Sequence, residues 1–249
     1  MFAVCMHTKL QCEVRLANMM LEPSHRSELI TQLFLNDRVE LLETTDTEWI
    51  RVKSGFNATE GWVLRAQFHE ISETAFTKLA IGILSVENTV EAFNDIPGTM
   101  YFDKETKPNH AVLPSYIRHD EKTLQRILYS FLETPYMWGG ISYAGIDCSG
   151  LSQIVYRFLG IPLTSFAAEQ FHEGEVLDFL QDARCGDLAF FEGDDKVIYH
   201  VGILLNNSEI VHATEKAGKV VIDHIDNEGI VSKRNGKRTH RLRIIKRFY

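Results

Sequence analysis

The chain has 249 residues, of which 45% are hydrophobic and 24% charged, a composition typical of a soluble globular protein with a sizeable core. Its formal net charge of −8 argues against nucleic acid or an anionic membrane surface as a partner, because both attract clustered lysine and arginine. The four cysteines (Cys5, Cys12, Cys148 and Cys185) form no CxxC pair and no Cys–His pattern at metal spacing, so we predict no metal, no cofactor and no disulfide framework.

The sequence contains no recognisable targeting or membrane segment. The first twenty residues place His7, Lys9, Glu13 and Arg15 among apolar ones, so no continuous h-region of a signal peptide can be drawn. No run of about 18 apolar residues occurs either. We therefore expect a cytoplasmic protein without a membrane span, although a secreted chain given without its leader would look the same.

Short β segments dominate residues 1–72. The segments 39–43, 49–52 and 61–64 are rich in β-branched and aromatic residues and are separated by turn formers, which predicts a small barrel. The preceding SELITQLFLND is interpreted as extended structure or loop rather than helix. Residues 73–118 combine the apolar run LAIGILSV with a polar stretch containing Pro97 and Pro108, and we interpret them as a linker or, equally, a reduced second barrel.

Helices followed by strands are predicted for residues 119–249. A helix capped by Asp120 ends at Pro135, a second helix begins near Cys148, and a short one covers 167–171. The period then changes to two, with strands expected at 188–191, 200–205, 209–213, 220–225 and 242–248. This order indicates an α+β fold, with helices packed on an antiparallel sheet.

Cys148 is a candidate nucleophile. The apolar residues that follow it have the spacing of one buried helical face, so Cys148 lies at a helix start, where free N–H groups and the positive pole of the helix dipole favour a thiolate. A lone cysteine is more often simply a small buried hydrophobe. The catalytic interpretation therefore requires a base and a group that orients it.

His200 and His212 are the candidates for these two roles. If a three-residue loop (206–208) joins their strands, Leu205 faces Glu209, Gly202 faces His212, and both imidazoles lie on one sheet face. A two-residue loop would put them on opposite faces. Two histidines could also bind a metal, but no third ligand stands at a recognisable spacing.

Five motifs in order, PYMWGG, DCSGL, GDLAFF, HVGI and IVHA, resemble the NlpC-type bacterial cell-wall endopeptidases, a family of papain-like cysteine peptidases. The resemblance covers about 120–249. It implies that Cys148 is the nucleophile, His200 the general base and His212 the orienting third residue. It also implies that the Tyr136 hydroxyl and the Cys148 backbone N–H form the oxyanion site.

The N-terminal segment is similar to the bacterial Src-homology-3-like barrels that often precede this domain. In the recycling branch with such barrels, the resemblance implies a free murein peptide, L-Ala-γ-D-Glu-diamino acid, cleaved after γ-D-Glu. Asp147, Ser149 and a barrel acid, for which Glu28 is the candidate, would hold its N-terminal amine. Relatives commonly carry Arg-Asp where this chain has Ser165 and Phe166, which puts the substrate contacts of that loop in doubt.

The sequence therefore predicts a γ-D-glutamyl-diamino acid endopeptidase acting on small murein peptides. Three alternatives remain: a secreted hydrolase of intact peptidoglycan, a papain-like amidase or acyltransferase with another substrate, and a wall-binding module. The preferred diamino acid and the oligomeric state stay open.

Overall fold

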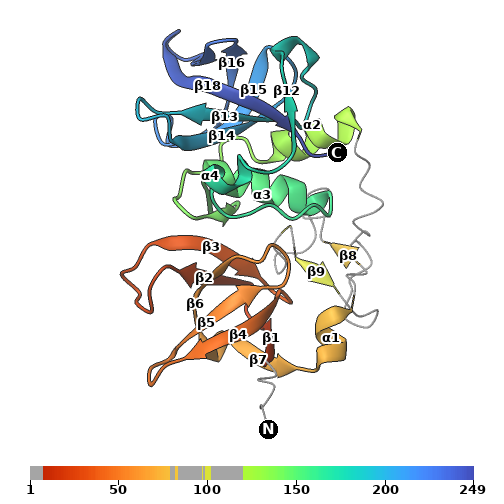
Figure 1. The fold of residues 1–249 in the computed structure, drawn as a ribbon, viewed down its shortest axis with the longest axis vertical. Helices are drawn as coiled ribbons and strands as arrows, with labels where there is room; N and C mark the ends of the chain where they lie inside the picture. Colours follow the sequence, from red (N-terminus) through yellow and green to blue (C-terminus); the bar gives the residue numbers. More distant parts are fainter. Residues whose placement is uncertain (1–7, 79–81, 84–96, 98, 102–119) are drawn as a thin grey trace. The chain divides into compact units, whose positions relative to one another are not determined.

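The computed structural model of the chain describes residues 8–78, 82–83, 97, 99–101 and 120–249 (Figure 1). The chain divides into two compact units, Met1–Tyr116 and Ile117–Tyr249. Within the described ranges, no helix is long and apolar enough to span a bilayer.

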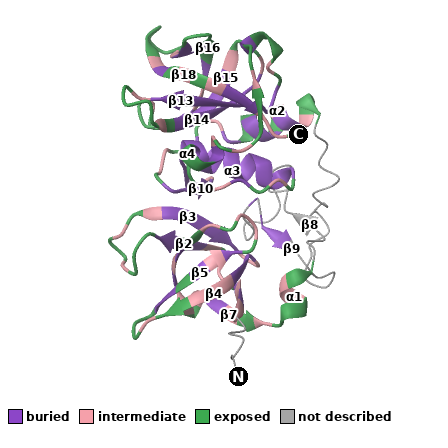
Figure 2. Ribbon diagram, in the orientation of Figure 1, coloured by how far each residue is buried: buried purple, intermediate pink, exposed green. Residues whose placement is uncertain are grey.

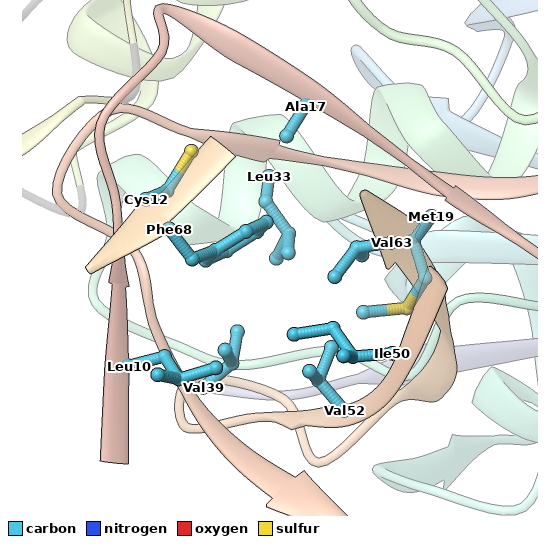
Figure 3. Close-up of a cluster of buried hydrophobic side chains, with 10 residues drawn as sticks. All are labelled: Leu10, Cys12, Ala17, Met19, Leu33, Val39, Ile50, Val52, Val63 and Phe68. Carbon is cyan, nitrogen blue, oxygen red and sulfur yellow. The ribbon is translucent and has the colours of Figure 1, made fainter. Parts of the chain in front are cut away.

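The N-terminal unit is built on a seven-stranded antiparallel sheet in the order β3-β2-β6-β5-β4-β1-β7. Buried side chains from these strands converge on one interior (Figure 3), among them Leu10, Val39, Val52 and Val63. The strands are β1 (Lys9–Cys12), β2 (Leu16–Met20), β3 (Leu29–Phe34), β4 (Arg38–Thr44), β5 (Trp49–Ser54), β6 (Glu60–Leu64) and β7 (Phe68–Ile71), with a 3₁₀ turn, η1 (Arg65–Gln67), before β7. The three strands expected from composition are β4, β5 and β6, and the SELITQLFLND stretch is extended as predicted.

Most of the segment interpreted as a linker or reduced second barrel, 73–118, lies outside the described residues. Its described parts are the short helix α1 (Glu73–Thr77) and the strand pair β8 (Gly82–Ile83) and β9 (Met100–Tyr101). The boundaries at 72 and 118 stay predictions.

The C-terminal unit contains a second seven-stranded antiparallel sheet, in the order β12-β18-β13-β14-β15-β16-β17. Because β17 pairs with β18 as well as with β16, the sheet closes on itself. Its strands are β12 (Glu175–Leu177), β13 (Leu188–Glu192), β14 (Ile198–Leu204), β15 (Glu209–Thr214), β16 (Lys219–Asp226), β17 (Gly229–Val231) and β18 (Arg238–Arg247). The prediction for the last strand was wrong at its start, since β18 begins four residues earlier than the expected 242.

Helices α3 (Cys148–Phe158) and α4 (Ala167–Gln170) pack against β14, and α2 (Glu121–Ser130) packs against α3 (Figure 1). The Asp120 carboxylate accepts a hydrogen bond from the Thr123 N–H at 2.9 Å, which confirms the predicted cap of α2. A small hairpin, β10 (Ile141–Ser142) and β11 (Gly145–Ile146), precedes α3, and a 3₁₀ turn, η4 (Leu180–Asp182), precedes β13.

Helix α3 is buried on all sides, whereas the sequence predicted one buried face. All eleven residues are buried (Figure 2). Its polar side is covered by the segment that follows it, since Ser152 Oγ donates to Gln170 Oε1 at 2.7 Å and Gln153 Nε2 to the Ser165 carbonyl at 3.3 Å. These hydrogen bonds satisfy polar groups that would otherwise be costly to bury, and they connect the helix to the segment that follows it.

Candidate active site

The N-terminus of α3 is capped by Asp147. Its Oδ1 accepts hydrogen bonds from the Gly150 N–H at 2.7 Å and from Ser149 Oγ at 3.0 Å, while Oδ2 accepts from the Gly139 N–H at 2.6 Å. The DCSG motif is thus both a helix cap and an anchor for the glycine-rich loop before it. Cys148 is the first helical residue, as the sequence predicted.

The loop and helix approach each other more closely than side chains would permit. A Cβ on Gly150 would lie 2.0 Å from the Gly140 carbonyl oxygen. Gly139 has a φ of 71°, in the left-handed region that favours glycine. The glycines of the two motifs therefore set the position of Cys148.

The two histidines meet as the predicted hairpin requires. Strands β14 and β15 pair Ile203 with Val211, and the Leu205 N–H donates to the Glu209 carbonyl at 2.9 Å, which is the register of a three-residue loop. His200 Nε2 lies 2.9 Å from His212 Nδ1. The prediction that both rings share one face is confirmed.

Cys148 lies beside His200 in the fold. The backbone N–H of Val201, the next residue on β14, donates a hydrogen bond to the cysteine sulfur. Burial, followed by the charge of Asp147, nevertheless raises the pKa of the Cys148 thiol to about 12. The expected bias towards thiolate is therefore wrong for the unliganded protein, because loss of hydration outweighs the donors at the helix end.

Burial also lowers the pKa of His200 well below its usual value, and His240, His212 and Lys216 add to this. The Cys148 thiol and the His200 imidazole are thus both neutral in the unliganded protein. Such a pair can act by general-base catalysis, with the proton leaving sulfur for the imidazole as sulfur attacks an electrophile.

Two further residues complete the cluster, and the sequence reasoning missed both. Asp223 Oδ2 lies 3.2 Å from His212 Nε2, and its Oδ1 accepts from the Lys233 N–H at 2.8 Å. His240 stacks on His200 with ring centroids 4.1 Å apart and an interplanar angle of 21°.

The sequence could have indicated Asp223 but not His240. Pairing of β15 with β16 sets Val221 opposite His212, so Asp223 is its diagonal neighbour, and a register argument extended by one strand would have found it. His240 reaches the site because β17 closes the sheet onto β18. No local pattern in the basic 233–247 segment indicates that closure.

The expectation that no third metal ligand lies near the histidine pair overlooked His240. Ring nitrogens of His200, His212 and His240 all lie within 4.8 Å of one another. A zinc ion needs lone pairs that converge on one point, whereas the stacked rings of His200 and His240 hold theirs in separate, nearly parallel planes. In this arrangement the cluster suits hydrogen bonding better than metal binding.

Comparison with known proteins agrees with this geometry. Residues 133–239 match the NlpC/P60 family, and residues 19–68 match the bacterial dipeptidyl-peptidase SH3 domain. Residues 133–239 are an NlpC/P60 domain. It follows a bacterial SH3 domain in an α+β chain, as the sequence motifs indicated, and the peptidases of this family are hydrolases.

Curated relatives are named as peptidases. Dipeptidyl-peptidase 6 of Lysinibacillus sphaericus is 24% identical over 86% of this chain and 90% of its own length. The gamma-D-glutamyl-L-lysine dipeptidyl-peptidase of Bacillus subtilis (strain 168) is 37% identical, but over only 36% of this chain and 31% of that protein. A crystal structure of an NlpC/P60 family protein from Bacillus cereus ATCC 10987 superposes with a TM-score of 0.74, covering 96% of this chain and 99% of that one. At 17% identity, that likeness shows the fold alone.

Three of the other predicted site residues are grouped in the NlpC/P60 domain. Tyr136 is held by its N–H, which donates to the Gly218 carbonyl at 2.8 Å. Burial raises the pKa of its hydroxyl, and the neighbouring Cys148 and Asp147 raise it further, so the hydroxyl stays a proton donor close to the cysteine. Ser149 lies in the helix cap with Asp147.

The remaining predicted residues belong to other segments of the chain. Glu28 is exposed next to β3 in the N-terminal unit, and its participation in substrate binding stays a prediction. In the loop that departs from the family pattern, Ser165 is buried and Phe166 is 36% exposed. The loop thus presents an aromatic ring to solvent.

A cavity of about 740 Å³ opens beside His212 and Asp223. It is lined in part by Lys216, Lys219 and Lys233. Two of these ammonium groups are already paired, Lys219 with Glu133 and Lys233 with Glu209. Neither Cys148 nor Tyr136 lines the cavity, so it is distinct from the space where sulfur would meet a substrate.

Proposed function

We propose that this protein is a cysteine peptidase that hydrolyses the bond between γ-D-Glu and a diamino acid in free peptidoglycan-derived peptides. The observation that carries the proposal is the hydrogen-bonded His200–His212 pair beside a cysteine at a capped helix start. The names of the relatives support the substrate class, since two of them are named gamma-D-glutamyl-L-lysine dipeptidyl-peptidase.

In the proposed reaction, Cys148 Sγ attacks the γ-carbonyl carbon of D-Glu, and the thiol proton passes to His200. The Tyr136 hydroxyl and the Cys148 backbone N–H donate to the developing oxyanion. His200 then protonates the leaving amine, and a thioester remains. Water, deprotonated by His200, hydrolyses the thioester and releases the dipeptide with restored thiol and imidazole.

The preference for a free N-terminal amine rests on Asp147. A carboxylate offers about four acceptor sites, and the cap uses two on Oδ1 and one on Oδ2. The Ser149 N–H is a fourth donor to this carboxylate, so an ammonium N–H would share an oxygen that already accepts a hydrogen bond. The Asp147 carboxylate is 5% exposed. An acylated amine offers it no ammonium, and the acyl group would replace the remaining water at the carboxylate with an apolar contact.

Mass spectrometry of products from L-Ala-γ-D-Glu-L-Lys and its diaminopimelate analogue tests the proposal. We expect L-Ala-γ-D-Glu as product, no turnover by Cys148→Ala, and full activity of the matched control Cys185→Ala, which also removes a buried free thiol. Wild-type rates in Cys148→Ala would refute thiol catalysis.

N-acetylated tripeptide and intact peptidoglycan serve as competing substrates. We expect both to react slower by orders of magnitude, and Asp147→Asn to narrow this gap, with thermal unfolding recorded because the same side chain caps α3. Equal cleavage of free peptide and intact wall would favour the wall hydrolase instead. A cytoplasmic location belongs to the free-peptide proposal, and cell fractionation tests it.

A further inference from the structure

We propose that Asp223 is a positioning residue that sets the proton arrangement of His212 and His200, extending the Cys148–His200–His212 series by a carboxylate. The inference rests on the proposed function for its kinetic consequences. Its structural part, the location of two ring protons, can be measured without any substrate.

Hydrogen-bonding capacity determines the order of donors and acceptors. An ionised carboxylate only accepts, so His212 Nε2, which lies 3.2 Å from Asp223 Oδ2, must carry a proton. In neutral His212 the other nitrogen, Nδ1, is then an acceptor. It lies 2.9 Å from His200 Nε2, which must therefore donate. His200 Nδ1 is left with a lone pair that can take the proton of Cys148.

The carboxylate is ionised in this setting. Burial acts to raise the pKa of Asp223, but hydrogen bonds from the His212 ring and from the Lys233 N–H, together with the positive charge of Lys233, outweigh it, so the pKa lies below its usual value. The ionised carboxylate of Asp223 thus determines which ring nitrogens of His212 and His200 donate and which accept.

The opposite arrangement would disable the base. If His212 carried its proton on Nδ1, that proton would point at His200 Nε2, and neutral His200 would hold its own proton on Nδ1. It would then present a donor instead of a lone pair to the cysteine. Asp223 excludes this state because His212 Nε2 and the carboxylate would then be two acceptors facing each other.

Asp223 also anchors the 232–237 turn through the Lys233 N–H, so a purely structural role must be separated from the positioning role. Two variants do this. In Asp223→Asn the amide oxygen can still accept from Lys233, while the amide nitrogen donates to His212 Nε2 and selects the wrong tautomer. Asp223→Ala removes the carboxylate and leaves room beside the cavity that His212 lines.

The cavity makes chemical rescue feasible. Formate is a carboxylate small enough to enter, and the positive charge of Lys216 on the cavity wall favours an anion. We expect formate to restore activity to Asp223→Ala and to leave Asp223→Asn unchanged, because the asparagine side chain still occupies the position.

The experiment measures kcat and KM for the free tripeptide with wild type, both variants and the control Asp226→Asn, an exposed carboxylate on the same strand. We expect kcat to fall about 10²–10⁴-fold in Asp223→Asn with little change in KM, as when a neutral amide holds a catalytic histidine in the wrong tautomer. The control is expected to match wild type. Wild-type kcat in Asp223→Asn, or equal loss in both variants without formate rescue, would overturn the proposal.

The ¹⁵N chemical shifts of the His200 and His212 rings provide the readout that needs no substrate. We expect the Nε2–H tautomer for both in wild type and the Nδ1–H tautomer for His212 in Asp223→Asn. An Nδ1–H tautomer of His212 in wild type would refute the inference even if the peptide is cleaved. Correct tautomers in an enzyme that cleaves no murein peptide would instead refute only the proposed function.

Discussion

The stacked histidine pair should make the C-terminal unit sensitive to acid. His240 is 5% exposed, its ring lies on that of His200, and its Nδ1 lies 2.8 Å from Thr239 Oγ1. Burial lowers the pKa of His240 to about 3, with further lowering by His212 and Lys216, although Asp223 acts to raise it. His240→Phe keeps an aromatic ring in this position and removes the titrating group.

The direction of the pH effect on stability follows from the number of protons that the folded and the unfolded states bind. Between pH 6.5 and about 3 the unfolded chain binds a proton at His240 that the folded protein does not, so stability is present above pH 6.5 and declines as pH falls through that window. Each pH unit in the window costs about 1.4 kcal/mol per group, hence about 2 kcal/mol at pH 5. His200, whose pKa is also lowered, adds a second loss of the same sign.

Urea unfolding at pH 7.5, 6 and 5 measures this effect in wild type and His240→Phe. We expect the free energy of unfolding of the variant to fall less on going from pH 7.5 to 5, by about 2 kcal/mol, whatever its stability at pH 7.5. His240→Gln repeats the comparison if phenylalanine packs poorly. The control is His224→Gln, an exposed histidine on β16. Equal pH dependence in wild type and both His240 variants would refute the reasoning.

Three further perturbations test the fold around the site. Gly150→Ala should destabilise the protein by about 1–3 kcal/mol in urea unfolding, because its Cβ would meet the Gly140 carbonyl; an unchanged midpoint would contradict the close approach. Asp187→Ala should cost about 3 kcal/mol, since Arg247, which donates to this buried carboxylate at 2.6 and 2.9 Å, would lose its carboxylate partner and keep only the Asp182 carbonyl; a loss below about 0.5 kcal/mol would match an exposed pair instead. Deleting residues 1–72 should impair cleavage of the free tripeptide or reduce stability, and a truncated enzyme that treats free and N-acetylated tripeptide as the full chain does would show that the SH3 domain plays no part in selection.

Local patterns in the sequence were sufficient for a large part of this protein. The Asp147 cap and the apolar spacing after Cys148 determined a helix start at the cysteine, because capping and helical periodicity depend on residues a few positions apart. The length of the loop between Leu205 and Glu209 determined that His200 and His212 share a face, since strand side chains alternate with a period of two.

Tertiary structure alone decided the surroundings of these groups. Burial reversed the expected thiolate bias of Cys148 and lowered the pKa of His200, and desolvation of this kind depends on what packs around a group, not on its neighbours in sequence. His240 joined the cluster only through closure of β17 onto β18, a long-range pairing within a segment whose basic composition indicates a solvated face. Asp223 lies between these cases: its strand was predicted, but its contact with His212 required the register of a second hairpin, where one residue of slip would have turned the carboxylate to the other face.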